Sequence, residues 1–245
     1  IPFIRQSERV QDREFLGKIK RLEASMNEDE RSVWVRDFRW NTYENQQTAK
    51  LLASDLEYAL SKGALELYYQ PQVKRDGTLY GCEALLRWNY MGQGFVYPPL
   101  IIALAVQGDF IGTLGMYIVE KACRDMAGAR TQAGCPVSFS VNILPLELED
   151  PSFADQVLKI LKDTGVEGSN LTIELTEQVA LNPGPNLERQ LEKLRESRVR
   201  ISMDDFGMGH GSLNYLNSAH YDEVKIDGSL IRRLPEHTQT CELVG

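Results

Sequence analysis

Short apolar runs alternate with helical stripes from Leu65 onward. Runs rich in β-branched, aromatic and leucine side chains predict six strands, over residues 65–73, 79–88, 136–143, 171–176, 199–204 and 223–230. Apolar side chains at helical spacing predict helices over 114–130, 153–162 and 187–197, the second of them capped by Ser152. Strands that alternate with helices predict an α/β fold built on a parallel sheet.

The N-terminal part follows a different pattern. Helical spacing predicts helices over 15–26 and 48–60, the second stopped by Gly63, and strict alternation predicts a strand over 31–40. Such stripes are typical of core packing. We therefore assign residues 1–50 to an appendage or linker and residues 51–245 to the main domain.

Composition narrows the functional classes. The chain has 245 residues, of which 42% are hydrophobic and 25% charged, and a single α/β barrel needs about 250 residues. A net charge of -8 provides no basic stripe for duplex nucleic acid. The longest apolar run, Pro98–Val106, is shorter than the ~20 residues of a membrane span.

Scattered cysteines without a C-x-x-C pair favour reduced thiols and a cytoplasmic location. The opening Ile-Pro-Phe, without Met, predicts an excised fragment, whose parent protein could be membrane-anchored elsewhere.

Polar side chains interrupt or end several predicted strands, at Glu83, Asn142, Glu174, Asp204-Asp205 and Lys225. In a barrel, the C-terminal ends of the strands meet at one face and supply the catalytic groups. Carboxylate and amide oxygens suit magnesium or manganese. The alternative is a set of internal salt bridges, for which Lys225 and Arg87 are the obvious cations. Because oxygens outnumber these two cations, the pattern favours bound metal.

The motifs themselves have a familiar order. Glu83-Ala84-Leu85 lies within Gly-Cys-Glu-Ala-Leu-Leu-Arg-Trp, after Tyr-Tyr-Gln70-Pro71. Then follow Asn142, Glu174-Leu-Thr-Glu177, Asp204-Asp205-Phe-Gly and Lys225-Ile-Asp. From about Leu56 to the C-terminus, this set resembles the EAL family of bacterial cyclic di-GMP phosphodiesterases.

The resemblance implies a TIM-like (β/α)8 barrel of the EAL type, with about six barrel strands present here. It implies hydrolysis of cyclic di-GMP to linear pGpG at a site that holds two Mg²⁺ or Mn²⁺ ions. The implied metal ligands are Glu83, Asn142, Glu174, Asp204 and Asp205, with Asp205 at the two-metal bridge. Lys225 positions or activates the attacking water, and Glu177 anchors the loop after Asp205. Gln70, Leu86 and Arg87 match substrate-binding positions.

Three departures from the family pattern qualify these expectations. The family's next strand carries a metal-site glutamate that has no counterpart before Gly245, so we expect a C-terminally truncated barrel with weak or absent activity. The loop after Asp205 lacks the family's Thr and Tyr, with Met208 and His210 in their place. The segment Ala105-Val106-Gln107, followed by Asp109, differs near a surface that often pairs barrels.

Two other interpretations stay open. A catalytically impaired EAL domain could bind cyclic di-GMP as a sensor, or bind a protein partner. A purely structural barrel could pair its inward polar residues internally. The resemblance also suggests a homodimer through the barrel and a preceding GGDEF or sensor domain.

Overall fold

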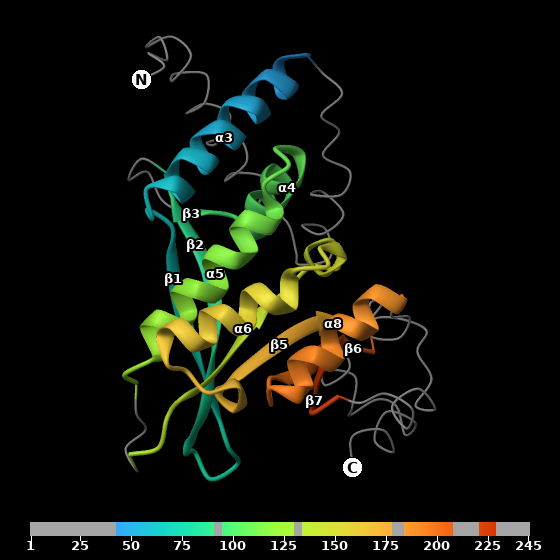
Figure 1. The fold of residues 1–245 in the computed structure, drawn as a ribbon. Coiled ribbons are helices and arrows are strands. Elements are labelled where there is room, and N and C mark those ends of the chain that lie inside the picture. The colour runs from blue at the N-terminus through green and yellow to red at the C-terminus, as the bar shows by residue number, and fades with distance from the viewer. Residues whose placement is uncertain (1–42, 91–94, 130–133, 178–183, 208–220, 229–245) are drawn as a thin grey trace. The chain divides into compact units, whose positions relative to one another are not determined.

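The computed structural model describes residues 43–90, 95–129, 134–177, 184–207 and 221–228 (Figure 1). The chain divides into two compact units, of which one comprises residues 1–66 and 86–114 and the other residues 67–85 and 115–245. The predicted helix over 15–26 and the predicted strand over 31–40 lie outside the described residues. The boundary between residues 50 and 51 stays a prediction.

The first unit contains two helices, α3 (Tyr43–Ser61) and α4 (Pro98–Gln107), which pack against each other. The short strand β3 (Phe95–Val96) pairs antiparallel with the end of β2 (Leu79–Asn89). The Tyr90 hydroxyl donates a 2.8 Å hydrogen bond to Asp55 of α3. Helix α4 was not predicted, because its apolar residues form a continuous run without helical periodicity.

A mostly parallel sheet dominates the second unit. Its strands lie in the order β1-β2-β4-β5-β6-β7, and the pairs β2–β4, β4–β5, β5–β6 and β6–β7 are all parallel. The further strands are β1 (Glu66–Val73), β4 (Ser138–Asn142), β5 (Leu171–Thr176), β6 (Arg200–Phe206) and β7 (Glu223–Ile226). All six predicted strands are therefore present, and the α/β architecture with a parallel sheet is confirmed.

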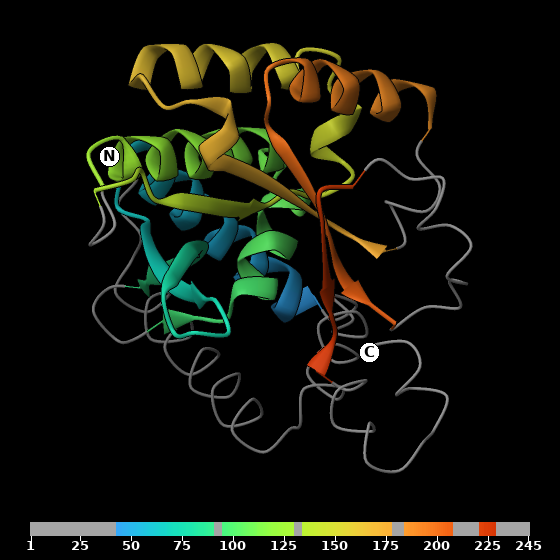
Figure 2. The ribbon, with the colours of Figure 1, turned by 90° about the horizontal axis from the view of Figure 1, so that it is seen from below.

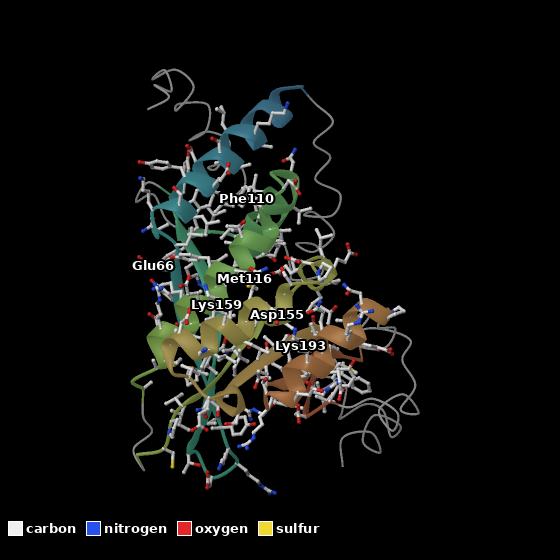
Figure 3. The ribbon with its side chains drawn as sticks, in the orientation of Figure 1. Glu66, Phe110, Met116, Asp155, Lys159 and Lys193 are labelled. Atoms are coloured by element: carbon white, nitrogen blue, oxygen red, sulfur yellow. The ribbon has the colours of Figure 1, made fainter. Side chains whose placement is uncertain are left out.

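Helices follow the strands as the alternation predicts. They are α5 (Ile111–Met126), α6 (Phe153–Thr164) and α8 (Pro185–Glu196), with 3-10 turns η2 (Glu147–Glu149) and η3 (Gly168–Asn170). Helices α6 and α8 lie side by side against one face of β5 and β6 (Figure 2). Asp155 of α6 and Lys193 of α8 form a 2.6 Å ion pair between them (Figure 3). The leucine and isoleucine side chains of β5, Leu171, Ile173 and Leu175, are completely buried.

The sheet of the second unit curls. The Tyr80 hydroxyl near the start of β2 accepts a 2.6 Å hydrogen bond from Arg200, the first residue of β6. It also donates a 3.3 Å hydrogen bond to Glu223, the first residue of β7. In the sheet order, β2 is not a neighbour of β6 or β7. Contacts between the first residues of these strands therefore require the sheet to curve, as in a partial (β/α)8 barrel.

The predicted Ser152 cap of α6 is wrong. Ser152 has φ -93° and ψ -3°, which is helical rather than extended, and its side chain makes no capping bond. Instead, its hydroxyl and its backbone N–H both donate to Asp150 Oδ1. A short acidic side chain that accepts a hydrogen bond from the backbone N–H two residues later is common in turns. The Ser152 hydroxyl oxygen accepts a 2.7 Å hydrogen bond from Gln156 Nε2 instead of from a backbone N–H of the helix.

Other boundaries moved by a few residues. Helix α5 begins at Ile111 and ends at Met126, whereas the expectation was 114–130. Strand β7 ends at Ile226, four residues before its predicted end. Within the described ranges, no helix has the length and apolarity to cross a membrane.

Candidate active site

An ammonium group lies among three carboxylates from three different strands. Lys225 Nζ of β7 is 2.9 Å from Glu83 Oε2 of β2 and 2.9 Å from Glu174 Oε2 of β5. Asp204 Oδ2 of β6 lies 3.5 Å from the same nitrogen. Parallel strands end at one edge of the sheet, so side chains far apart in sequence meet there.

Asn142, the last residue of β4, joins this cluster. Its Nδ2 donates a 2.8 Å hydrogen bond to Glu83 Oε1. In the sheet, Asn142 lies opposite Glu174, and the next residue, Ile143, donates its N–H to the Glu174 carbonyl oxygen at 3.1 Å. Strands β2, β4 and β5 thus contribute neighbouring oxygen-bearing side chains.

Asp205 follows Asp204 with an unusual backbone. Its φ is +56°, a left-handed conformation that costs energy for most residues other than glycine. The pairing of β6 with β7 is irregular between Met203 and Phe206. This local irregularity breaks the strict alternation of the strand, and the Asp205 N–H bonds to Asp204 Oδ1 at 2.9 Å.

Burial and charge shift the acid–base behaviour of the cluster. Burial raises the pKa of Glu174, which is 1% exposed, and the nearby Lys225 charge opposes that rise. Burial would lower the pKa of Lys225, but the charge of Glu174 and hydrogen bonds to Glu174 and Glu83 outweigh it, so this pKa is raised. Desolvation and the charge of Asp204 raise the pKa of Asp205.

Glu177 lies just beyond β5 and holds the turn after β6. Its carboxylate is 3% exposed, and Oε2 accepts a 2.9 Å hydrogen bond from the Gly207 N–H. Gly207 has φ +99°, a conformation that favours glycine. This contact links the segment after Asp205 to the strand that carries Glu174. Met208 and His210 lie outside the described residues.

Comparison with known proteins places this geometry in a family. The model of the EAL domain matches residues 53–245. The chain belongs to the EAL domain family.

Two curated relatives and one solved structure show how close the likeness is. The EAL domain is 33% identical over 193 residues to the cyclic di-GMP phosphodiesterase NbdA of Pseudomonas aeruginosa, covering 78% of this chain and 25% of that protein. It is 33% identical over 202 residues to the bifunctional diguanylate cyclase/cyclic di-GMP phosphodiesterase MucR of the same organism, covering 82% of this chain and 30% of MucR. The chain therefore spans less than a third of the length of either relative.

The solved PaMucR phosphodiesterase in complex with c-di-GMP superimposes with a TM-score of 0.69 at 33% identity, covering 79% of both chains. Together with the family match, this likeness identifies the sheet and helices described above as part of an EAL-type TIM barrel.

The three residues that the resemblance assigned to substrate binding lie on β1 and β2. Gln70 lies in β1 and is exposed. Leu86 and Arg87 follow Glu83 along β2, and Arg87 Nη1 donates a 2.8 Å hydrogen bond to the Leu86 carbonyl oxygen. Leu86 and Arg87 belong to the first unit and Glu83 to the second. Their contact with a substrate stays a prediction.

The side-chain oxygen atoms of the cluster are of the types that bind a divalent metal ion. It consists of carboxylates and one amide, which are the ligands that Mg²⁺ and Mn²⁺ prefer. Glu174 Oε1 is buried without a hydrogen-bond partner of good geometry, so it has a lone pair available. In the described part of the chain, however, no three His, Cys, Asp or Glu side chains lie in a geometry that could hold a metal ion. Lys225 occupies the centre of the cluster.

Three residues with hydroxyl side chains, which the sequence analysis missed, each lie two positions before a residue of the cluster. Ser140, Thr172 and Ser202 precede Asn142, Glu174 and Asp204 by two residues on their strands, and all three are buried. Residues two apart point to the same face of a strand. The sequence contained this signal, since the pattern Ser-x-Asn, Thr-x-Glu and Ser-x-Asp recurs on three successive strands.

Proposed function

We propose that this EAL domain hydrolyses cyclic di-GMP to linear pGpG with Mg²⁺ or Mn²⁺ as cofactor. The observation that carries the proposal is the convergence of Glu83, Asn142, Glu174, Asp204 and Lys225 from five strands of one sheet. The names of NbdA and MucR, and the nucleotide in the solved PaMucR structure, support cyclic di-GMP as the substrate.

The reaction adds water across one phosphodiester bond. A water oxygen bonds to phosphorus, the bond to the ribose 3′ oxygen breaks, and that oxygen leaves with a proton. Two divalent ions held by Glu83, Asn142, Glu174, Asp204 and Asp205 would neutralise the phosphate and lower the pKa of the attacking water.

The protein's own groups supply orientation. Lys225 lies at the centre of the carboxylates, where its N–H groups can donate to a water or to a phosphate oxygen. Arg87 provides a planar fork for a phosphate, and we assign Gln70 and Leu86 to contacts with the nucleotide. Glu177 accepts a hydrogen bond from the Gly207 N–H, two residues after Asp205, and we assign it to orienting the Asp205 carboxylate.

The test is incubation of the complete protein with cyclic di-GMP and Mg²⁺ or Mn²⁺, with pGpG measured by chromatography. Glu83→Gln should lower turnover by more than about 100-fold, because a metal ligand matters at least as much as the outer-shell partners whose loss costs 10–100-fold. Glu196→Gln makes the same chemical change on the exposed side of α8 and should leave turnover unchanged. Absence of pGpG from the wild-type protein under all metal conditions would reject the proposal.

A second candidate is a domain that binds cyclic di-GMP without hydrolysing it. One observation favours it: the Lys225 ammonium already compensates Glu83, Glu174 and Asp204, as the internal-pairing interpretation of the sequence anticipated. Nucleotide affinity in calorimetry, combined with no pGpG at any metal concentration, would select this candidate over the enzyme.

Partners follow from the same relatives. MucR is named as a diguanylate cyclase as well as a phosphodiesterase, so we propose a preceding GGDEF domain in the complete protein. A homodimer through the barrel and a cytoplasmic location, where a nucleotide messenger is available, complete the proposal.

A further inference from the structure

We propose that Glu147 is a positioning residue for Asn142, because it fixes the turn that carries the chain away from β4. The inference rests on the proposed function, since it concerns one of the side chains assigned to the metal. Glu147 is not part of the acidic cluster. It begins the 3-10 turn η2, five residues after Asn142.

Two reciprocal hydrogen bonds close the turn. Glu147 Oε2 accepts a 2.7 Å bond from the Leu144 N–H, and the Glu147 N–H donates a 3.0 Å bond to the Leu144 carbonyl oxygen. A glutamate that reaches back three residues to a backbone N–H forms one half of a capping box. Both backbone groups of Leu144 are therefore fixed by one residue.

Leu144 is separated from Asn142 by a single residue. That residue, Ile143, is 3% exposed and donates its N–H to the Glu174 carbonyl oxygen. Asn142 is thus held on its C-terminal side by two consecutive backbone N–H groups with defined acceptors. If Leu144 were released, the chain beyond β4 would lose one of these two backbone anchors, and the Asn142 amide would be held less firmly relative to Glu83.

The far side of the turn is pinned from helix α8. Asn186 Nδ2 donates to the carbonyl oxygens of Leu148 and Glu149, at 3.2 and 3.0 Å. Gln190 Nε2 donates to the Pro151 carbonyl oxygen at 2.7 Å. Because the segment after Glu147 is immobilised by these bonds, Glu147 can transmit that rigidity back to Leu144.

Gly115 of helix α5 faces the Glu147 carboxylate, which occupies the space that a side chain at this position would fill. A Cβ on Gly115 would overlap Glu147 Oε1. Glu147 is 5% exposed, and a buried carboxyl group is costly, so apolar packing alone would be better served by another side chain. A buried glutamate facing a glycine on the neighbouring helix therefore indicates that the role of this side chain is its hydrogen bond to the Leu144 N–H.

The experiment measures Mn²⁺ affinity by calorimetry, and hydrogen exchange of the Leu144 amide, in the complete protein. Glu147→Ala should weaken Mn²⁺ binding about tenfold, the lower end of what loss of an outer-shell partner costs, and should accelerate exchange at Leu144. Glu147→Gln should restore both, because an amide oxygen can accept the same hydrogen bond. Val157→Ala, which removes buried methyl groups from α6, controls for loss of stability and should leave Mn²⁺ affinity unchanged.

A double-mutant cycle with Gly115→Ala sharpens the test. In the wild-type background, the new methyl group should displace Glu147 and weaken Mn²⁺ binding. In the Glu147→Ala background, the clash is absent, so the substitution should add no further loss and should raise the melting temperature through better helix propensity. Additive effects in the two backgrounds would contradict the proposed contact.

The outcomes separate the two proposals. A wild-type protein that binds Mn²⁺ but yields no pGpG rejects the proposed function and leaves the role of Glu147 standing. Normal turnover with unchanged Mn²⁺ affinity in Glu147→Ala, or equal weakening in Val157→Ala, overturns the role of Glu147 alone. A wild-type protein without Mn²⁺ affinity overturns both.

Discussion

At the scale of single residues, Glu147 couples the stability of the fold to pH. Burial raises the pKa of this carboxyl from 4.5 to about 7, and the hydrogen bond from Leu144 only partly offsets the rise. Between these values the folded chain holds a proton that the unfolded chain has lost. The contribution of this carboxyl group to stability is therefore greatest below pH 4.5 and falls as the pH rises to about 7, by on the order of 3 kcal/mol.

Urea unfolding of the wild type and of Glu147→Gln between pH 4.5 and 7.5 measures this contribution. The glutamine variant is neutral at every pH, so the difference between the two unfolding free energies should change in favour of the variant as the pH rises. Parallel curves would show that Glu147 does not titrate in this range.

Residue types and spacing predicted which side chains meet, but not their conformations. Glu83, Asn142, Glu174, Asp204 and Lys225 were singled out because each interrupts an apolar strand, and the structure brings them together. The left-handed backbone of Asp205 could not be foreseen, because an aspartate carries no obligatory signal for positive φ. Glu147 was missed because a single glutamate between leucines resembles an exposed turn residue.

At the scale of elements, Gln190 joins helix α8 to the start of α6. Its side chain is 3% exposed. Oε1 accepts a 3.0 Å bond from the Ala154 N–H, and Nε2 donates to the Pro151 carbonyl oxygen. Gln190→Leu keeps the size but leaves these backbone groups unsatisfied, so we expect a loss of about 1–3 kcal/mol in unfolding free energy.

Arg189→Leu provides the matched control, since it places the same side chain on the exposed neighbouring position of α8. Surface changes of this type alter stability by about 0.5 kcal/mol or less. Chemical denaturation of both variants checks the difference. Equal effects would mean that the buried amide contributes nothing beyond its bulk.

The elements that the sequence predicted well are those whose pattern agrees with their environment. Strand β5 spans 171–176 as predicted, because Leu171, Ile173 and Leu175 alternate with polar residues at the period of a strand. Helix α4 was missed because its sequence is apolar on every face and therefore shows no helical period, although the structure buries only one stripe of it. The Ser152 cap failed because the Ser152 backbone is already helical and its hydroxyl oxygen accepts a hydrogen bond from Gln156 Nε2.

At the scale of the whole molecule, the order of the βα units decides where the chemistry lies. Parallel strands with right-handed helical connections place their C-terminal ends together, so strand order alone predicts the edge at which the site forms. The ion pairs at that edge were not predictable, because they depend on the side-chain conformations that bring Lys225 within contact distance of the carboxylates. Lys225 pairs with carboxylates of three strands. Its charge therefore decides whether these carboxylates need a metal ion to compensate them in the folded protein.

Replacing Lys225 therefore tests whether the fold needs its ammonium group or whether a metal ion can compensate the carboxylates in its place. Lys225→Met in the metal-free protein leaves Glu83, Glu174 and Asp204 uncompensated, and should lower the unfolding free energy by about 2 kcal/mol. This is less than for a fully buried pair, because the Lys225 side chain is 23% exposed. Excess Mn²⁺ should stabilise the variant more than the wild type, because freed carboxylates bind the ion more tightly and stabilisation grows with affinity.

Lys193→Met, which breaks the exposed pair with Asp155, should cost less than about 1 kcal/mol and show no Mn²⁺ dependence beyond that of the wild type. Thermal unfolding with EDTA and with Mn²⁺ measures all three proteins, and an identical Mn²⁺ shift in each would show that the carboxylates around Lys225 do not hold the ion.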